Sequence, residues 1–371
     1  MPLAIHLPPL HAATQVTVVI PARNESAVLP KTLTALAEQC GVAGEPLHVD
    51  LFDVVVLANN CTDDTARVAR ALNDVRGFPK IVVAEVELPA SIAHAGTARR
   101  LVMESVARRY LKARKPLGIV ASTDADTRVD RMWVASIIDE MQAADAVTGR
   151  IHMEREHLAG LKPATRLLYL RDQIYRRLVS ELDAMLDPVP CDPLPRHGQH
   201  FGASFAVTAA AYMRAGGVPP NARHEDIAFY EALDRSDARV RHSMRVRVAT
   251  SARLEARAEG GFATFLSGLD AREKLLVECP ELTVLRLRTR PLLRRLWRGQ
   301  GTTADHRRAR IIYGASQSDW GELLRSDQPF GNNLWRIERF AARDWQRFLP
   351  VSIELALPSI RSLHATHRKL G

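Results

Sequence analysis

The sequence predicts an α/β protein with a mainly parallel sheet flanked by helices, followed by a helical C-terminal extension. Short apolar runs alternate with amphipathic segments up to about residue 265. Strands that alternate with helices normally form a parallel, doubly wound sheet with right-handed crossovers. Beyond that point the alternation stops, and the sequence is helical in pattern and basic. We therefore expect a lead-in (1–14), an α/β domain (15–265) and a basic helical extension (266–371).

Four strand-and-helix repeats make up the first half of the α/β domain. In each repeat, an apolar run ends in a polar turn and is followed by apolar residues at helical spacing. The predicted strands are 15–20, 52–58, 80–86 and 117–121. The apolar faces of the helices between and after them are marked by Leu29, Leu33 and Leu36; Val68 and Leu72; Val102, Val106 and Tyr110; and Val134, Ile137, Ile138 and Met141.

The second half of the domain is less regular. We predict strands at 145–153 and 201–207, a long amphipathic helix at 165–185, a Pro-rich loop at 187–195, a short helix ended by Gly216 and Gly217, and a helix from His224 to Leu233. From residue 239 to 248, apolar and mainly basic residues alternate, which indicates a half-buried strand. His242 falls on its apolar face, and we interpret it as a core residue rather than a ligand.

Composition limits the possible functions. The chain has 371 residues and a net charge of +9, which favours anionic ligands, although a solvated basic surface would give the same charge. No run approaches the ~18 apolar residues of a membrane span, and the proline-containing N-terminus lacks the basic segment of a signal peptide. Four separated cysteines suggest free thiols and a cytoplasmic protein. No recognition module indicates nucleic-acid binding.

Two aspartates mark the most informative point of the chain. Asp124 and Asp126 follow the apolar run 117–121 at the carboxyl end of a predicted strand. Side chains at i and i+2 point to one side of a strand, and open α/β sheets bind ligands at this edge. Carboxylate oxygens suit Mg²⁺ or Mn²⁺ together with substrate phosphates. Capping of the helix after Met132 is the alternative role for acidic residues here.

Five segments in this order resemble the family 2 glycosyltransferases, which have the GT-A fold. The resemblance covers roughly residues 14–265 and includes a Pro-x-x-Asn-Glu loop, a turn after the second strand, an Ala-Arg segment, an Asp-x-Asp motif and a Glu-Asp pair. In this chain they are Pro21-Ala-Arg-Asn-Glu25, Asn59-Asn-Cys-Thr-Asp-Asp64, Ala98-Arg99, Asp124-Ala-Asp126 and Glu225-Asp226.

The resemblance implies sugar transfer from a nucleotide-diphosphate sugar to an acceptor hydroxyl. Asp126, with Asp124, would hold Mg²⁺ or Mn²⁺, and Asp226, with Glu225 as the second candidate, would be the general base. Direct displacement with such a base inverts the sugar configuration, although retaining relatives exist. The residues expected to contact the nucleotide sugar are Pro21, Arg23, Glu25, Asn59, Arg99 and Asp124.

The chain also departs from the family pattern. Ala58 and Asn59 stand where relatives carry paired acids, and the region 248–253 has no histidine to complete a metal site. Arg253 and Arg257 are further candidates for phosphate contact, and the segment His197-Gly-Gln-His200 is a candidate for acceptor contact. A sugar-phosphate nucleotidyltransferase and a non-catalytic nucleotide-sugar binding protein are the alternative functions.

The segment Arg286–Arg298 combines six arginines with leucines and a tryptophan. Such a composition fits an anionic membrane surface, an anionic acceptor, or packing of the leucines inside the protein. We favour packing, and we expect Pro291 to interrupt the helix.

Overall fold

A computed structural model describes residues 5–221, 223–250, 262–271 and 274–368 of the chain. Its internal contacts divide the chain into two compact units. The first consists of Met1–Leu161, Gln199–Leu233 and Arg239–Ser267, and the second of Lys162–Gly198, Asp234–Ala238 and Gly268–Gly371. The long helix that the sequence analysis assigned to the α/β domain thus has its contacts in the second unit. In the described part of the chain, no helix is both long and apolar enough to span a bilayer.

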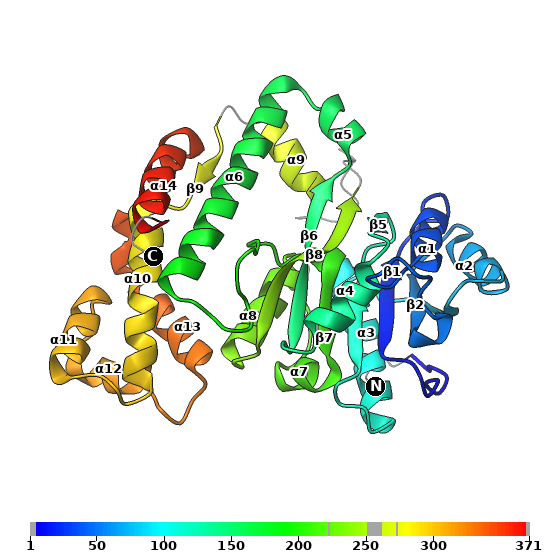
Figure 1. Ribbon diagram of the computed structural model, residues 1–371, viewed down its shortest axis with the longest axis horizontal. Helices are drawn as coiled ribbons and strands as arrows, with labels where there is room; N and C mark the ends of the chain where they lie inside the picture. The colour runs from blue at the N-terminus through cyan, green and yellow to red at the C-terminus, as the bar shows by residue number, and fades with distance from the viewer. Residues whose placement is uncertain (1–4, 222, 251–261, 272–273, 369–371) are drawn as a thin grey trace. The chain divides into compact units, whose positions relative to one another are not determined.

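An eight-stranded sheet forms the framework of the first unit (Figure 1). Its spatial order is β3-β2-β1-β4-β7-β6-β8-β5. In chain order, the strands are β1 (Val16–Ala22), β2 (Phe52–Asn59), β3 (Lys80–Val86), β4 (Ile119–Ser122), β5 (Thr127–Val129), β6 (Ala146–Met153), β7 (Phe205–Thr208) and β8 (Val240–Thr250). The pairs among β3, β2, β1 and β4 are parallel, as is β6 with β8, whereas β7 is antiparallel to both neighbours and β5 to β8. The predicted α/β class is confirmed, with a sheet that is parallel in its first half and mixed in its second.

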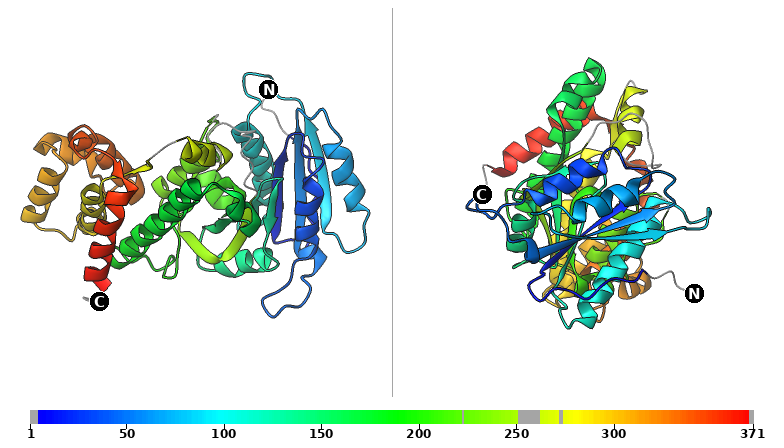
Figure 2. Two further views of the ribbon diagram at one scale, coloured as in Figure 1. Left: turned by 90° about the horizontal axis from the view of Figure 1, so that it is seen from above. Right: turned by 90° about the vertical axis from the view of Figure 1, so that its right-hand side faces the viewer.

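Helices cover both faces of this sheet, and the strands of the first unit show its twist clearly in Figure 2. The helices of the first unit are α1 (Leu29–Ala37), α2 (Thr65–Asn73), α3 (Ala95–Lys112), α4 (Trp133–Glu140), α5 (Arg155–Gly160), α7 (Ala209–Arg214), α8 (Glu225–Arg235) and α9 (Phe262–Asp270), of which α8 and α9 continue into residues of the second unit. Single 3₁₀ turns lie at Val49–Leu51 and Gly202–Ser204.

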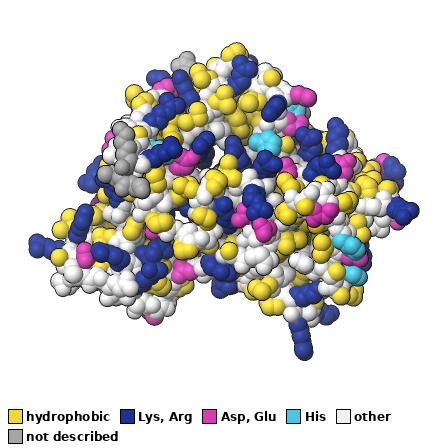
Figure 3. All heavy atoms as spheres, viewed as in Figure 1, with side chains coloured by type: hydrophobic (Ala, Val, Ile, Leu, Met, Phe, Trp, Pro, Cys, Tyr) yellow, Lys and Arg dark blue, Asp and Glu magenta, His cyan; other side chains and the backbone are white. Residues whose placement is uncertain are grey.

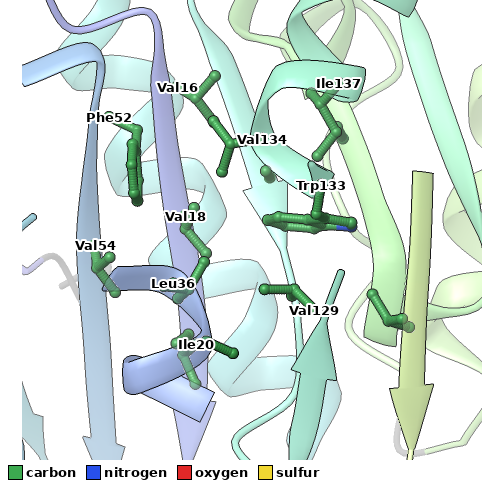
Figure 4. Close-up of a cluster of buried hydrophobic side chains, with 14 of the residues drawn as sticks. Val16, Val18, Ile20, Leu36, Phe52, Val54, Val129, Trp133, Val134 and Ile137 are labelled. Atoms are coloured by element: carbon green, nitrogen blue, oxygen red, sulfur yellow. The ribbon is translucent and has the colours of Figure 1, made fainter. Parts of the chain in front are cut away.

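Alternation along β1 decides which helix lies on which face. Val18 and Ile20 pack with Leu36 of α1 and Trp133 of α4 in one buried cluster, shown in Figure 4. Thr17 points the other way and hydrogen-bonds Tyr110 of α3. This period of two is expected of a strand buried on both faces. It explains why β1 and β2 read as nearly continuous apolar runs.

Two predicted strands differ from the structure. Strand β4 begins at Ile119, and Leu117, expected inside it, is 74% exposed. Strand β7 begins only at Phe205, because residues 202–204 form a 3₁₀ turn. The short strand β5 gave no sequence signal.

The predicted alternation of β8 is wrong in the first half of the strand. Arg241 and Ser243 are buried there, while Val240 and His242 are only half-buried. Pairing with β6 shifts by three residues after Ser243, and this irregularity reverses which residues face the core. Arg241 is accommodated by Glu140 of α4, with Nε 3.1 Å from Oε2.

The second unit is mainly helical, as predicted for the C-terminal region. Its helices are α6 (Pro163–Leu186), α10 (Pro280–Trp297), α11 (Thr303–Ile312), α12 (Gln317–Leu323), α13 (Phe330–Ala341) and α14 (Ile353–Arg368), with a 3₁₀ turn at Asp344–Arg347. Two short strands, β9 (Leu276–Val277) and β10 (Val351–Ser352), pair antiparallel. Capping boxes at Thr302 and Ser316 begin α11 and α12. A buried cluster that includes Leu293, Tyr313 and Trp345 forms the core.

Helix α10 corrects one prediction and supports another. It continues through Pro291, which we expected to interrupt it. Packing favours the continuous helix, because Leu287, Leu293 and Leu296, on both sides of the proline, are all buried. The leucines of the segment 286–298 therefore pack inside the protein, as favoured above.

Candidate active site at the carboxyl end of the central strands

The two predicted metal-binding aspartates lie in the turn between β4 and β5. Asp124 and Asp126 are both half-buried, whereas Ala125 between them is buried. The carbonyl of Ala125 accepts a hydrogen bond from Thr32 Oγ1 of α1 at 2.7 Å, and the amide of Thr127 donates to the carbonyl of Asp124 at 3.2 Å. These bonds fix the backbone of the turn on which both carboxylates are carried.

Arg99 on α3 is the centre of a hydrogen-bond network at this edge of the sheet. Its side chain is 8% exposed. Nη2 donates to Asp124 Oδ1 at 2.8 Å, and Nε donates to Glu225 Oε1 at 3.2 Å. Nη1 donates to Ser122 Oγ at 2.5 Å and to the carbonyl of Gly202 at 3.0 Å. Arg99 thus connects the end of β4 to the start of α8, and four of its contacts are to protein oxygens rather than available to a phosphate.

The charge of Arg99 is stabilised despite its burial. Burial opposes the charged form, but Asp124 and Glu225 outweigh that effect and raise the pKa of Arg99 above its ordinary value. A guanidinium suits this position, because its planar set of donors can bond several oxygens at fixed angles. The carboxylates of Asp124 and Glu225 are held in place by the same group.

The predicted base, Asp226, is held in the first turn of α8. Its Oδ2 accepts a hydrogen bond from the amide of Gly202 at 3.0 Å, and its Oδ1 accepts one from the amide of Ile227 at 2.8 Å. A carboxylate offers about four lone-pair sites. The two bonds therefore leave the Asp226 carboxylate able to accept a further hydrogen bond, such as one from a hydroxyl group. Asp226 is half-buried, whereas Glu225 is buried and bonded to Arg99.

Two glycines allow this close arrangement. A Cβ added at Gly202 would lie 2.6 Å from Cζ of Arg99, and one at Gly96 would lie 2.3 Å from the carbonyl oxygen of Asn221. Both distances are shorter than any normal contact. A side chain at either position would force Arg99 or the segment before α8 to move.

The loops that follow β1 and β2 are bonded to each other. The side chain of Asn24 accepts a hydrogen bond from the amide of Thr62 at 2.8 Å. Asn24 and Asn60 have φ angles of 57° and 49°, in the left-handed region that asparagine tolerates better than most residues. Asparagines at these two positions therefore permit the tight turns that bring the loops together.

Asp63 strengthens the same connection between the loops. Its Oδ2 accepts from the amide of Ser26 at 3.0 Å, and its Oδ1 accepts from both the amide and the hydroxyl of Thr65. Desolvation acts to raise the pKa of Asp63, but the bonds from Ser26 and Thr65 outweigh it and lower the pKa to about 2. The amide of Glu25 also donates to Thr65 Oγ1, at 2.8 Å.

The residues predicted to contact the donor lie at one edge of the sheet. Pro21 and Asn59 are the penultimate residue of β1 and the last residue of β2, and Arg23 and Glu25 follow in the first loop. Arg23 is exposed and donates from Nη1 to the carbonyl of Ala93 at 3.2 Å. Since β1 lies between β2 and β4 and is parallel to both, the three strands end on the same side as Asp124. Open α/β sheets bind ligands on this side.

The remaining candidates are three histidines and two arginines. Arg253 and Arg257 lie outside the described residues. His197 is buried in the second unit. In the first unit, the rings of His200 and Tyr230 stack with centroids 4.3 Å apart, and His242 contacts Tyr230 edge-on at 5.6 Å. His242 thus has a packing contact, although it is half-buried rather than part of the core.

Sequence reasoning missed several residues that organise the site. Ser122 and Gly202 bond Arg99, while Asn24 and Asp63 join the two loops. The Asn-Glu and Thr-Asp-Asp turn sequences signalled loops after β1 and β2. No local pattern indicated that Gly202, about a hundred residues from Arg99 in the chain, would contact it.

Comparison with known proteins gives an independent view of this chain. Residues 17–89 match the family described as Glycosyl transferase family 2. Uncharacterized glycosyltransferases of Mycobacterium tuberculosis and Mycobacterium bovis are 34% identical over 151 residues, which cover 40% of this chain. The same alignment covers 53% of each relative, so the chain spans about half the length of the curated relatives that it matches.

Among solved structures, similarity extends over most of the chain at low sequence identity. Staphylococcus aureus TarS (1–349) in complex with UDP-GlcNAc is similar with a TM-score of 0.48 at 13% identity, covering 90% of this chain and 73% of that one. A mannosyltransferase from Pyrobaculum calidifontis in complex with GDP-Man and Mn²⁺ has a TM-score of 0.45 at 16% identity, covering 89% and 87%.

Proposed function

We propose that this chain, whose residues 17–89 match the family described as Glycosyl transferase family 2, is a glycosyltransferase that transfers a sugar from a nucleotide-diphosphate donor to an acceptor hydroxyl. The observation that carries the proposal is the Arg99 network, in which one buried guanidinium bonds both Asp124 and Glu225. It links the carboxylates predicted for the donor to the helix start predicted for the acceptor. Sugar transfer needs the donor-binding carboxylates and the acceptor-binding residues close together, because the acceptor attacks while the donor bond breaks.

The donor would bind over the ends of β1, β2 and β4. Pro21, Arg23, Glu25 and Asn59 provide the surface for the nucleoside, and Asp124 the side nearer the diphosphate. Arg99, bonded to Asp124, would act as a positioning residue for that carboxylate rather than as a phosphate ligand.

A divalent cation fits this site only with help from the donor. The described residues contain no cluster of three or more His, Cys, Asp or Glu side chains that could hold a metal by themselves. Asp126 and Asp124 supply hard oxygen ligands, and Mg²⁺ commonly completes such a pair with substrate phosphates and water. When bound, Mg²⁺ or Mn²⁺ would stabilise the negative charge of the departing diphosphate.

Asp226 is the better of the two candidates for the general base. Glu225 is buried, and its carboxylate is engaged by the Arg99 guanidinium rather than exposed to an acceptor. Asp226 bonds only two backbone amides in the contacts described above and is half-buried. The acceptor O–H would lose its proton to Asp226 as its oxygen attacks the anomeric carbon and the bond to the diphosphate breaks. This displacement inverts the anomeric configuration.

The cellular setting follows from the chemistry of the cysteines. All four cysteines lie in the described residues, and none is in a disulfide. Free thiols are usual in reducing compartments, so we propose a cytoplasmic enzyme that uses cytoplasmic nucleotide sugars. An anionic acceptor would suit a chain of net charge +9.

A panel of nucleotide sugars incubated with the full chain and Mn²⁺ tests the proposal. We expect hydrolysis of at least one donor, releasing a nucleoside diphosphate, because water can replace the acceptor slowly. A sugar-phosphate nucleotidyltransferase would instead form a nucleotide sugar and pyrophosphate from a nucleoside triphosphate and a sugar phosphate. Donor binding without any turnover would identify a non-catalytic binding protein. Either result would contradict the proposed transfer.

A further inference from the structure

A groove in the second unit has no role in the proposed transfer. Its cavity volume is about 590 Å³, and three of its lining residues are arginines of α13 or of the turn that follows. The complete lining is Gly314, Leu323, Trp335, Arg336, Arg339, Phe340, Arg343 and Asp344. The groove is therefore basic, with two aromatic side chains and one carboxylate.

The spacing of the three arginines puts them on one side of the helix. Arg336, Arg339 and Arg343 are separated by three and four residues, so they follow one stripe of α13 and its continuation. At 1.5 Å of rise per residue, they span ~10 Å. This row of positive charge is longer than a single phosphate group.

These arginines differ from three arginines of α10 in the same unit. On α10, Arg286, Arg290 and Arg294 each form an ion pair, with Glu338, Asp183 and Asp187 at 2.7–2.9 Å. Within the described part of the chain, by contrast, no carboxylate lies within 4.0 Å of the guanidinium nitrogens of Arg336, Arg339 or Arg343. The three α10 ion pairs stabilise the fold, whereas the N–H groups of the groove arginines are able to donate to a bound ligand.

The ring of Trp335, which lines the groove, contacts two guanidinium groups. The guanidinium of Arg339 lies 5.2 Å from the centre of its ring, and that of Arg235 lies at the same distance. Cation–π contact holds a guanidinium in place while its N–H groups remain able to donate. Arg339 is thus oriented before any ligand arrives, which lowers the entropy cost of binding.

We propose that this groove binds a ligand carrying at least two phosphate groups. Guanidinium groups bond phosphate oxygens in pairs and keep their charge at any physiological pH. Three of them along ~10 Å match successive phosphates better than a single anion. Positive charge alone does not single out this groove, because Lys and Arg side chains are common on the face drawn in Figure 3. This groove is distinguished by the combination of a cavity and three neighbouring arginines that line it and have no ion pair among the described residues.

Titration calorimetry of the full chain with inorganic tripolyphosphate tests the proposal. The titration is done without divalent metal, because the proposed donor site in the first unit depends on it. We expect Arg336→Gln/Arg343→Gln to weaken binding at least about tenfold, since each lost charge-assisted bond removes a factor of that order. Asp344→Asn should tighten binding, because it removes the one carboxylate of the groove.

Arg361→Gln is the matched control. Arg361 is an exposed arginine of α14 in the same unit and lies outside this groove. The Arg361→Gln variant should bind tripolyphosphate with the same affinity as the wild type. Thermal melts of all variants verify folding, and Mn²⁺-dependent nucleotide binding should be the same in each. Equal affinity of the double variant and the Arg361 control would overturn the proposal.

Vesicles distinguish a lipid source of the phosphates from a soluble one. Neutral vesicles, with and without a lipid whose headgroup carries two phosphate monoesters, are sedimented with the protein. Selective pelleting that the double variant loses supports the site and assigns a lipid headgroup. Tripolyphosphate binding without pelleting supports the site and assigns a soluble ligand. If wild type binds neither probe, the proposal is wrong.

Discussion

Helix α3 carries two buried arginines that face opposite ends of the same sheet. Arg109 bonds Asp53 at 2.7 Å and the carbonyls of Pro8 and Pro9. Arg99, ten residues earlier, bonds Asp124 and Glu225. Both side chains are less than a tenth exposed. Both guanidinium groups form ion pairs with carboxylates, yet the carboxylates differ in how much solvent they contact.

The difference lies in what each carboxylate can still do. Asp53 is buried, its carboxylate bonds Thr17 and Arg109, and Thr17 in turn bonds Tyr110, so this pair closes a network in the interior. Asp124 is 38% exposed beside Arg99. The Arg109 pair fastens the N-terminal segment to the sheet, whereas Arg99 fixes one carboxylate, that of Asp124, which still reaches solvent. We propose that the exposure of the acid distinguishes a functional buried ion pair, such as Arg99–Asp124, from a structural one, such as Arg109–Asp53.

The largest effect is expected from Asp226→Asn at the Arg99 end. General-base catalysis typically contributes ~10²–10⁴-fold, so turnover should fall by that factor while nucleotide binding stays nearly unchanged. The amide keeps an oxygen that can accept from Gly202. Steady-state kinetics and nucleotide titration measure the two quantities separately. A loss of less than tenfold would transfer the role to Glu225 or to another residue.

Arg109→Met should separate stability from activity. Removing one partner of a buried ion pair typically costs ~3–5 kcal/mol of unfolding free energy, because the other charge stays buried without compensation. Denaturant unfolding should show this loss, while kcat of the folded fraction stays at the wild-type value. Arg99→Met should lower both stability and kcat. The comparison fails if the two variants have the same effect on kcat.

Gly202→Ala tests whether Arg99 needs its close approach to the backbone. The added Cβ would lie 2.6 Å from Cζ of Arg99, and overpacking of this kind costs ~1–3 kcal/mol. Gly160→Ala in α5 is the control, because its Cβ would meet nothing within 4 Å. We expect reduced kcat and stability only for Gly202→Ala. Wild-type kinetics in that variant would show that the position of Arg99 is not critical.

The smallest effect concerns acid stability of the joined loops. The bonds from Ser26 and Thr65 hold the pKa of Asp63 at about 2 in the folded chain, below its ordinary value of 3.8. A lowered folded pKa stabilises the protein above the unfolded pKa, and that contribution is lost as the pH falls from about 4 towards 2. Unfolding of the wild type and Asp63→Asn should therefore differ at pH 6 and converge near pH 2. A constant difference would exclude this linkage.

Sequence predicted the framework better than the site. Buried runs such as 52–58 fixed the parallel half of the sheet, because strands buried on both faces have an unmistakable composition. The irregular pairing of β8 after Ser243 left no local signal, so its burial pattern was inverted. Helix α10 passed through Pro291 because tertiary packing outweighed local preference.

For the site, sequence identified the carboxylates but not what holds them. Asp124 was found from its place after a strand, and Asp226 from the resemblance of the Glu225-Asp226 pair to the family 2 glycosyltransferases. The roles of Ser122 and Gly202 depend on contacts between residues far apart in the chain, which periodicity cannot show. Arg99 was expected to face a phosphate, and only the three-dimensional contacts reveal its bonds to two carboxylates.

Mn²⁺-dependent binding of a nucleoside diphosphate tests most directly whether the Arg99 end of the sheet is the donor site. Calorimetric titrations of the wild type and Asp126→Asn are compared with and without Mn²⁺, using the nucleotide released in the donor panel. We predict that Mn²⁺ tightens binding to the wild type and leaves binding to the folded Asp126→Asn variant unchanged. If Mn²⁺ tightens binding equally in both proteins, Asp126 does not hold the metal and the donor site lies elsewhere.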